Sequence, residues 1–533
     1  MTAPVLIVLP QGLNVSGVTV WAVRLAGALA ARGRPVTLLL HAEPAVQGRI
    51  GVAPHPDVRV LRPAGLPALG PDEPDTGGPF EARMSKLTPA YLAAFDQAGP
   101  GSDAPLIVIP NLHADSYAAA VEAARARPGR TRVIGWQHSD IAYDLRVLEH
   151  FEPALSAIVA VSDRIESRWR DARAARPGPV APREGERPPP PIENIPYGVP
   201  IPGAVPVRPP LRGESGPCRP LRLIYSGRLE HFQKRVLALV HLSDQLASRD
   251  VWHEMSIVGD GPARADLAGL VREHGAAGRV ALLGPSGPAR VLELLDAHDV
   301  LVLPSRYEGL SVSMLEAMSR GCVPVLARTD SGAAQAVTPG VDGEIAPVSM
   351  RADESEAGVA LAEATIMLLR RDPTLERTRA AAYRTAGERF SIGAHADRVS
   401  ALLDRVASEP SRAWPPDRPV EFGGSVGPDA SVRLAALLDQ LRGRAVAVHG
   451  TGRHTAELWR VFAAGPARLV ALCDDDRQRH GTRAHGLPVV APEEAGRAGA
   501  TDIIISSFMH QDAIWARRDV YRAQGLAVHR IYR

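Results

Sequence analysis

One stretch of the chain, residues 300–325, most constrains what it can fold into. Residues 300–303 are apolar and β-branched, as is typical of a buried strand. A short loop follows, and Ser311 or the serine two residues later can cap a helix. Gly321 supplies the stop of that helix, and residues 322–326 predict a further strand. A strand, loop, helix and strand in such close succession indicate a parallel α/β sheet.

Two carboxylates flank the predicted start of this helix. Glu308 lies in the loop and Glu316 lies about one turn into the helix. Between them, Gly309, Leu310 and Ser311 bring free N–H groups and the positive end of the helix dipole, which favour a phosphate. Carboxylates accept hydrogen bonds from hydroxyls, so a phosphate joined to sugars fits this layout. The other interpretation is a surface loop with one capping and one solvated glutamate.

A second constellation follows the strand predicted at residues 221–225. It contains Gly227 and Arg228 and, a few residues later, Lys234. Arginine offers a fork of donors and lysine a compact charge, and together they suit two phosphate groups. The chain has 61 basic residues but only two lysines, so the place of this lysine is informative. The alternative is a solvated lysine at the start of a helix.

The run from Glu308 to Glu316, EGLSVSMLE, together with Gly-Arg-Leu at residues 227–229 and Lys234, resembles the signature of the retaining GT-B glycosyltransferases of family 4. The resemblance implies that Glu308 faces the donor sugar and that Glu316 binds the ribose of the nucleotide. It implies that Arg228 and Lys234 neutralise the diphosphate. It also implies a nucleotide-diphosphate sugar as donor, with no metal and no further cofactor.

The N-terminal half predicts a second sheet that contributes to the same site. Residues 5–9 read as a buried strand, and the loop at residues 10–17 leads into an amphipathic helix. The resemblance implies that Gly17 lets the backbone approach the donor phosphate or the acceptor, although a simple turn explains it equally well. His138 follows the strand predicted at residues 133–136, and the resemblance places it near the donor sugar. A structural histidine is the alternative.

The length of 533 residues indicates about three domains. We expect an α/β protein with two Rossmann-like lobes (GT-B) and a third, small Rossmann-like domain. The predicted divisions are residues 1–205 for the acceptor-side lobe, 206–408 for the donor-binding lobe, 409–430 for a linker and 431–533 for the accessory domain. The last helix of the second lobe is expected to cross back to the first.

The accessory domain has a partial nucleotide-binding pattern. Gly450 and Gly452 follow a predicted strand, and Asp474 lies 24 residues after Gly450, near the spacing of the ribose-binding acid. Thr455 stands where a third glycine is usual. The domain either binds a nucleotide or is an assembly or regulatory module without a ligand, which could mediate self-association. We prefer the second interpretation.

The leading hypothesis is a retaining, metal-independent glycosyltransferase of cell-surface polysaccharide or glycoconjugate synthesis. Its acceptor would be a hydroxyl of an unknown glycan, lipid-linked molecule or small molecule. One alternative is a sugar-nucleotide epimerase of the same architecture, and another is a non-catalytic nucleotide-sugar sensor. The intact arginine, lysine and glutamate sets count against a sensor.

Composition and charge set the expected location and partners. A net charge of +2 gives no reason to expect nucleic acid as a partner. Three widely spaced cysteines, no secretory signal and no spanning segment predict a cytoplasmic protein. Five arginines in residues 163–176 surround two apolar side chains, which is the pattern of a helix that contacts the inner face of a membrane. A solvated arginine face is the preferred interpretation of this helix.

Overall fold

The structure is a computed structural model, and it describes residues 2–14, 16–43, 51–69, 80–99, 103–111, 113–175, 187–213, 216–231, 233–329, 332–349, 352–422, 430–507 and 511–532. The chain forms two compact units. The first comprises residues 1–140 and 147–420, and the second comprises residues 141–146 and 421–533. Part of the predicted linker, residues 423–429, lies outside the described residues.

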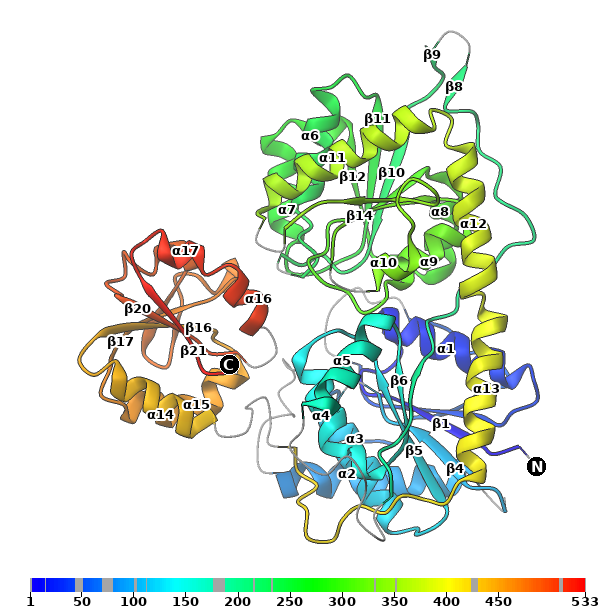
Figure 1. Ribbon diagram of the computed structural model, residues 1–533, viewed down its shortest axis with the longest axis vertical. Coiled ribbons are helices and arrows are strands. Elements are labelled where there is room, and N and C mark those ends of the chain that lie inside the picture. Colours follow the sequence, from blue (N-terminus) through cyan, green and yellow to red (C-terminus); the bar gives the residue numbers. More distant parts are fainter. Residues whose placement is uncertain are drawn as a thin grey trace. The chain divides into compact units, whose positions relative to one another are not determined.

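The first unit begins with a seven-stranded parallel sheet in the order β3-β2-β1-β4-β5-β6-β7 (Figure 1). The strand order reverses between β1 and β4, so the loops that follow these two strands border one crevice. β1, β2 and β4 are fully buried, as sheets covered on both faces require. The strands are β1 (Val5–Leu9), β2 (Val36–Leu40), β3 (Arg59–Leu61), β4 (Leu106–Ile109), β5 (Thr131–Gln137), β6 (Leu155–Ala160) and β7 (Ile192–Asn194).

The helices of this lobe start at that carboxyl edge of the sheet. α1 begins directly after the loop that follows β1, and the Ser16 hydroxyl caps it by accepting from the Thr19 N–H at 3.1 Å. The lobe contains α1 (Gly17–Ala30), α2 (Phe80–Ala98), α3 (Ala114–Arg125), α4 (Ala142–Phe151) and α5 (Asp163–Ala174).

The second lobe repeats the plan with a six-stranded parallel sheet in the order β12-β11-β10-β13-β14-β15. Its order reverses between β10 and β13, which brings the loops carrying the predicted cations and the predicted carboxylates to one edge. The strands are β10 (Leu221–Ser226), β11 (His253–Val258), β12 (Val280–Gly284), β13 (Val300–Leu303), β14 (Val323–Ala327) and β15 (Glu344–Ala346). The helices are α6 (Ala238–Ala247), α7 (Arg264–Glu273), α8 (Pro288–Ala297), α9 (Val312–Ser319), α10 (Ala333–Ala336), α11 (Glu354–Arg371) and α12 (Glu376–Phe390).

The last helix of this unit, α13 (Ile392–Ser408), returns to the first lobe as predicted (Figure 1). The Trp21 indole of α1 donates to Nε2 of His395 at 3.0 Å. Arg32 and Asp397 form an ion pair at 2.9 Å, and Arg34 pairs with Asp404. α13 therefore fixes the first lobe to the end of the second.

The second unit contains a third sheet, in the order β18-β19-β17-β16-β20-β21. All its neighbouring strands are parallel except β18 and β19. A small apolar core that includes Ala447, Ile503 and Tyr521 lies against the sheet. Its elements include α14 (Ala430–Gln440), β16 (Ala445–His449), α15 (Arg453–Ala464), β17 (Arg468–Cys473), β18 (Arg483–Ala484), β19 (Leu487–Val490), β20 (Asp502–Ile505), α16 (Gln511–Ala516), α17 (Asp519–Arg522) and β21 (Ala527–Arg530). The predicted α/β class with two Rossmann-like lobes and a third small domain is confirmed.

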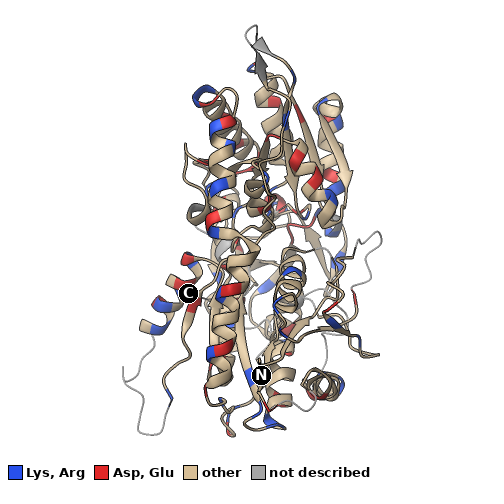
Figure 2. Cartoon of the chain, turned by 90° about the vertical axis from the view of Figure 1, so that its right-hand side faces the viewer, with Lys and Arg blue, Asp and Glu red and all other residues tan. Residues whose placement is uncertain are grey.

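Charged side chains of both signs alternate along the long helices, while the strands carry few (Figure 2). In α5, the apolar Ile165 and Trp169 are fully buried inside the lobe. Its arginines pair with acids, as in the contact from Arg168 to Asp140 at 2.5 Å. This helix therefore presents arginines that are ion-paired, and whether it contacts a membrane stays a prediction. Within the described ranges, no helix is both long and apolar enough to cross a bilayer.

Candidate functional site

The helix start predicted from residues 300–325 is formed by α9. Of the two candidate serines, Ser311 is the cap, and its hydroxyl accepts from the Met314 N–H at 3.4 Å. Leu310 is buried beneath this turn and anchors it to the lobe. The first N–H groups of α9 therefore lie at the carboxyl edge of the sheet, where an anion is favoured.

Lys234 and Glu308 meet at this edge. The Lys234 ammonium lies 2.5 Å from Oε1 of Glu308, and both side chains are largely buried. The loop that presents the lysine is tied down, because the Lys234 N–H donates to the Glu230 carboxylate at 3.1 Å. The structure thus brings one predicted cation and one predicted carboxylate together, from the loops after β10 and β13.

Arg228 lies in the same loop after β10 and is exposed. Its carbonyl accepts from the Tyr225 hydroxyl at 2.8 Å, which fixes the backbone. The guanidinium makes no hydrogen bond or ion pair with any residue that the structure describes. Gly227 next to it allows a close approach, since a Cβ there would lie 2.9 Å from the Tyr225 hydroxyl oxygen. Arg228 therefore keeps its donors available to a ligand.

Glu316 forms an ion pair that the sequence did not predict. Nη2 of Arg24, in α1 of the first lobe, lies 2.6 Å from Oε1 of Glu316, in α9 of the second lobe. The side chains are 16% and 8% exposed, respectively. Burial raises the pKa of Glu316, and the positive charge of Arg24 opposes that rise. Nη1 of Arg24 is buried and has no hydrogen-bond partner among the residues that the structure describes.

The imidazole of His138 is buried and bonded at both nitrogens. Nδ1 lies 2.7 Å from the Tyr197 hydroxyl, and Nε2 lies 3.0 Å from Oδ1 of Asn111. The Asn111 amide donates to the Val8 carbonyl at 2.9 Å, so its oxygen must face His138. Nε2 therefore carries the proton and Nδ1 accepts from Tyr197. Burial lowers the pKa of His138 to about 3, which keeps the ring neutral.

The two lobes approach each other closely around these residues. A Cβ at Gly309 would lie 2.0 Å from the His138 carbonyl oxygen, so only glycine fits there. Gly17 at the start of α1 lies near Val312 at the start of α9, with 3.7 Å from an ideal Cβ to Cγ2 of the valine. The starts of two helices, one from each lobe, thus lie next to each other, and the pair of Arg24 and Glu316 joins the same two helices.

Sequence reasoning missed three residues of this arrangement: Arg24, Asn111 and Tyr197. Each matters only through a partner far away in the sequence. Asn111 offered the one available signal, because it closely follows an apolar strand-like run, residues 106–109, at the edge of the sheet where ligands bind. The structure adds that its φ of 51° is unusual for a residue other than glycine.

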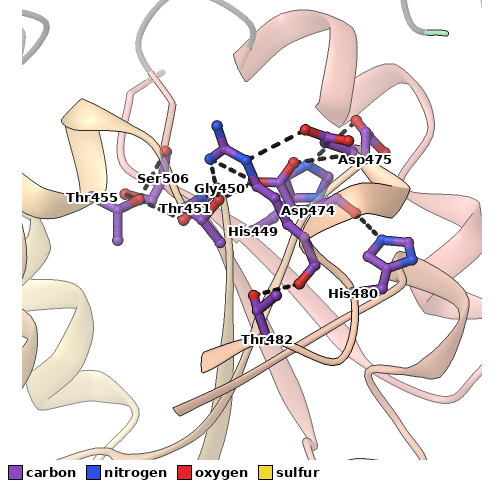
Figure 3. Close-up of polar contacts among 11 residues, drawn as sticks. His449, Gly450, Thr451, Thr455, Asp474, Asp475, His480, Thr482 and Ser506 are labelled. Atoms are coloured by element: carbon purple, nitrogen blue, oxygen red, sulfur yellow. Dashed lines mark hydrogen bonds and ion pairs between the residues drawn. The ribbon is translucent and has the colours of Figure 1, made fainter. Parts of the chain in front are cut away.

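In the second unit, the loop after β16 bonds to its own surroundings (Figure 3). Gly450 has a φ of 117°, and a Cβ there would lie 2.7 Å from the Ser506 carbonyl oxygen. Asp474, predicted for the ribose position, accepts from the Thr451 N–H at 3.2 Å. The Thr455 hydroxyl donates to the Gly450 carbonyl at 2.7 Å, which gives the residue in place of the third glycine a structural contact. Whether this unit binds a nucleotide stays a prediction.

Comparison with known proteins shows which family the second lobe is similar to. The sequence profile of the family described as Glycosyl transferases group 1 matches residues 220–371. The chain carries a group 1 glycosyltransferase domain. Alpha-D-kanosaminyltransferase of Streptomyces kanamyceticus is 29% identical to it over 189 residues, which are 35% of this chain and 46% of the relative. The chain thus matches less than half the length of this relative.

The group 1 domain and the lobe before it together have the GT-B fold. Anabaena HepE, in a crystal structure with UDP and glucose, superposes with a TM-score of 0.53 and 19% identity. The match covers 75% of this chain and 99% of HepE. Sucrose-phosphate synthase of Thermosynechococcus elongatus gives a TM-score of 0.55 and 20% identity, over 76% of this chain and 99% of that protein. At these identities the likeness shows the fold, and the predicted GT-B architecture is confirmed.

Proposed function

We propose that the protein transfers a sugar, with retention, from a nucleotide-diphosphate sugar to an acceptor hydroxyl. The observation that carries the proposal is a pair of ion pairs on either side of the start of α9, Lys234 with Glu308 and Arg24 with Glu316. Cations and N–H groups there suit a diphosphate, and carboxylates suit the hydroxyls on either side of it. UDP-glucose is the first donor to test, because HepE was crystallised with UDP and glucose.

Each residue has a role in this proposal. Glu316 accepts from the ribose hydroxyls and Arg24 keeps its carboxylate ionised. Arg228 and Lys234 neutralise the diphosphate, assisted by the backbone of Gly309, Leu310 and Ser311. These donors are in place before the reaction, so charge that develops on the leaving diphosphate is stabilised without reorganisation.

The sugar is held by the residues on the other side of the anion site. Glu308 accepts from hydroxyls of the donor sugar, and Lys234 holds its carboxylate in place at 2.5 Å. His138 acts as a positioning residue, because both its ring nitrogens are bonded to Tyr197 and Asn111. It supports the backbone against which Gly309 packs, and Gly17 gives the matching close approach at α1.

In the transfer step, the bond between the anomeric carbon and the diphosphate oxygen breaks. The acceptor oxygen bonds to the same carbon from the same face, and its proton passes to the departing phosphate oxygen. The protein contributes position, charge stabilisation and the exclusion of water by the adjoining lobes. The described residues contain no group of three or more histidine, cysteine or acidic side chains that could hold a metal. Independence from metal stays a prediction, to be tested by adding EDTA.

The purified chain incubated with UDP-, GDP-, ADP- and dTDP-sugars, with and without a panel of sugar acceptors, tests the proposal. We expect release of one nucleoside diphosphate and its loss, by at least a hundredfold, in Lys234→Gln. Arg290→Gln is the matched control, since among the described residues Arg290 pairs only with the exposed Glu293 on α8, at 2.8 Å. Isomerisation of the donor without an acceptor would instead indicate an epimerase, and binding without turnover a sensor.

A further inference from the structure

A polar pocket lies in the first lobe, apart from the groups assigned to the donor. It is lined by the charged residues Arg83, Lys86 and Asp115 and by apolar side chains that include Leu69 and Leu87. The cavity volume is about 90 Å³. One water occupies roughly 10–15 Å³ by the same measure, so the cavity has room for a group of several non-hydrogen atoms.

The pocket opens at the same sheet edge as the proposed donor site. Leu69 is held there because its N–H donates to the carbonyl of Pro10, directly after β1, at 2.8 Å. Asp115 lies in the first turn of α3, which follows β4. Four residues before it, Asn111 bonds His138, whose carbonyl abuts Gly309. The pocket is thus connected to the predicted sugar position through residues that touch one another or lie a few positions apart in the sequence.

Among the described residues that line the pocket, two of the three charges cancel each other. The Arg83 guanidinium donates two hydrogen bonds to the Asp115 carboxylate, at 2.8 Å from Nε to Oδ2 and 3.2 Å from Nη2 to Oδ1. Both side chains are nearly buried, at 9% and 12% exposed. A bidentate pair of this kind is rigid and leaves no net charge.

Lys86 supplies the remaining charge. It lies on the exposed side of α2, one helical turn after Arg83, and its ammonium bonds none of the residues described by the structure. It is one of only two lysines in a chain with 61 basic residues, and the other, Lys234, lies at the proposed diphosphate. A lysine ammonium is a compact point charge that suits phosphate or carboxylate oxygens.

We propose that this pocket binds the acceptor and that the acceptor bears an anionic group, either a phosphate monoester or a carboxylate, on its sugar or cyclitol ring. The inference rests on the proposed transfer function. Lys86 pairs with the anionic group. A cationic amino sugar is disfavoured, because Asp115 is already neutralised by Arg83.

Calorimetry of the full chain, saturated with its preferred nucleoside diphosphate, tests whether the pocket binds an anionic acceptor. The probes are glucose, glucose 6-phosphate, glucuronate and glucosamine. We expect glucose 6-phosphate or glucuronate to bind at least tenfold more tightly than glucose, and glucosamine to bind no better than glucose. Comparison of the two anions shows whether the pocket prefers phosphate or carboxylate.

Variants at Lys86 separate the pocket from the donor site. Lys86→Gln should reduce the preference for the anionic probe to within twofold of glucose, and Lys86→Arg should retain most of it. Nucleoside diphosphate affinity should stay unchanged in both variants. An anion preference that survives Lys86→Gln, a preference for glucosamine, or no binding of either anion overturns the proposal. Failure of the wild type to bind any nucleoside diphosphate would instead refute the proposed function.

Discussion

Arg24 and Glu316 form an ion pair that joins the two lobes, with 2.6 Å between Nη2 and Oε1. The arginine comes from α1 and the glutamate from α9, the two helices whose starts face the crevice. One contact therefore links closure of the lobes to the ionisation of the proposed ribose-binding carboxylate. This coupling makes Arg24 the most informative residue outside the recognised motifs.

Removing one partner of this pair should cost more than removing both. Arg24→Met leaves the buried Glu316 carboxylate unpaired, which should lower the free energy of unfolding by about 3 kcal/mol. The double variant Arg24→Met with Glu316→Leu should recover a large part of that loss. Urea denaturation of the wild type, both single variants and the double variant gives the coupling energy. Strict additivity of the two single effects would show that the pair does not form.

The affinity for UDP should depend on pH through Glu316. Burial raises the pKa of Glu316 above its usual value near 4.5, so the folded protein holds this proton more tightly than the unfolded chain does. As the pH falls, Glu316 gains its proton, and the free-energy penalty for burying a charged carboxylate is relieved. Ribose binding weakens at the same time, because it uses the ionised form. In Arg24→Met the loss of UDP affinity should begin at a higher pH.

Calorimetric titrations with UDP between pH 5 and 8 measure that onset. Glu316→Gln is the control, since it has no proton to gain and should bind weakly, with only the pH dependence that the terminal phosphate of UDP, whose pKa is about 6, itself causes. The same onset in the wild type and in Arg24→Met would contradict the assigned role of the arginine.

His138 should stay neutral across the physiological range. Its pKa is lowered to about 3 by burial, so nitrogen NMR should show a proton on Nε2 alone and no titration between pH 5 and 8. Tyr197→Phe removes the hydrogen bond to Nδ1 and should lower the free energy of unfolding by about 1 kcal/mol. An imidazole signal for His138 that titrates near pH 6.5 would exclude this arrangement.

Arg235 occupies a conformation that glycine prefers. Its φ is 48°, its side chain is fully buried, and its Nε and Nη2 have no hydrogen-bond partners within the described part of the chain. Arg235→Gly and Arg235→Ala remove the same contacts, but alanine keeps the backbone strain. Glycine should therefore be the more stable of the two by about 1 kcal/mol in urea denaturation. At Arg290, inside α8, the order should reverse, because alanine is the better helix former.

Much of the fold could be predicted from the sequence because the buried strands are short apolar runs punctuated by glycine and proline. The strands at residues 5–9 and 300–303 and the return of α13 were read correctly from such local patterns. The predicted domain boundaries stay predictions.

The candidate site was predictable only where a motif lies within one loop. Glu308, Glu316 and Lys234 were found because strand ends at a switch point converge on one edge. Arg24 and Tyr197 were missed because their partners lie far away in the sequence, and no local pattern encodes such a pair. The spacing from Gly450 predicted Asp474 as a ribose-binding acid. In the structure its carboxylate accepts a hydrogen bond from the Thr451 N–H, a contact that the spacing does not encode.

A crystal structure of the full chain with UDP, or with whichever nucleoside diphosphate binds more tightly, tests the central claim most directly. We predict ribose hydroxyls at Glu316, with Arg24 still paired to it, and the diphosphate between Arg228, Lys234 and the start of α9. A nucleotide bound elsewhere, with these side chains untouched, would contradict the account.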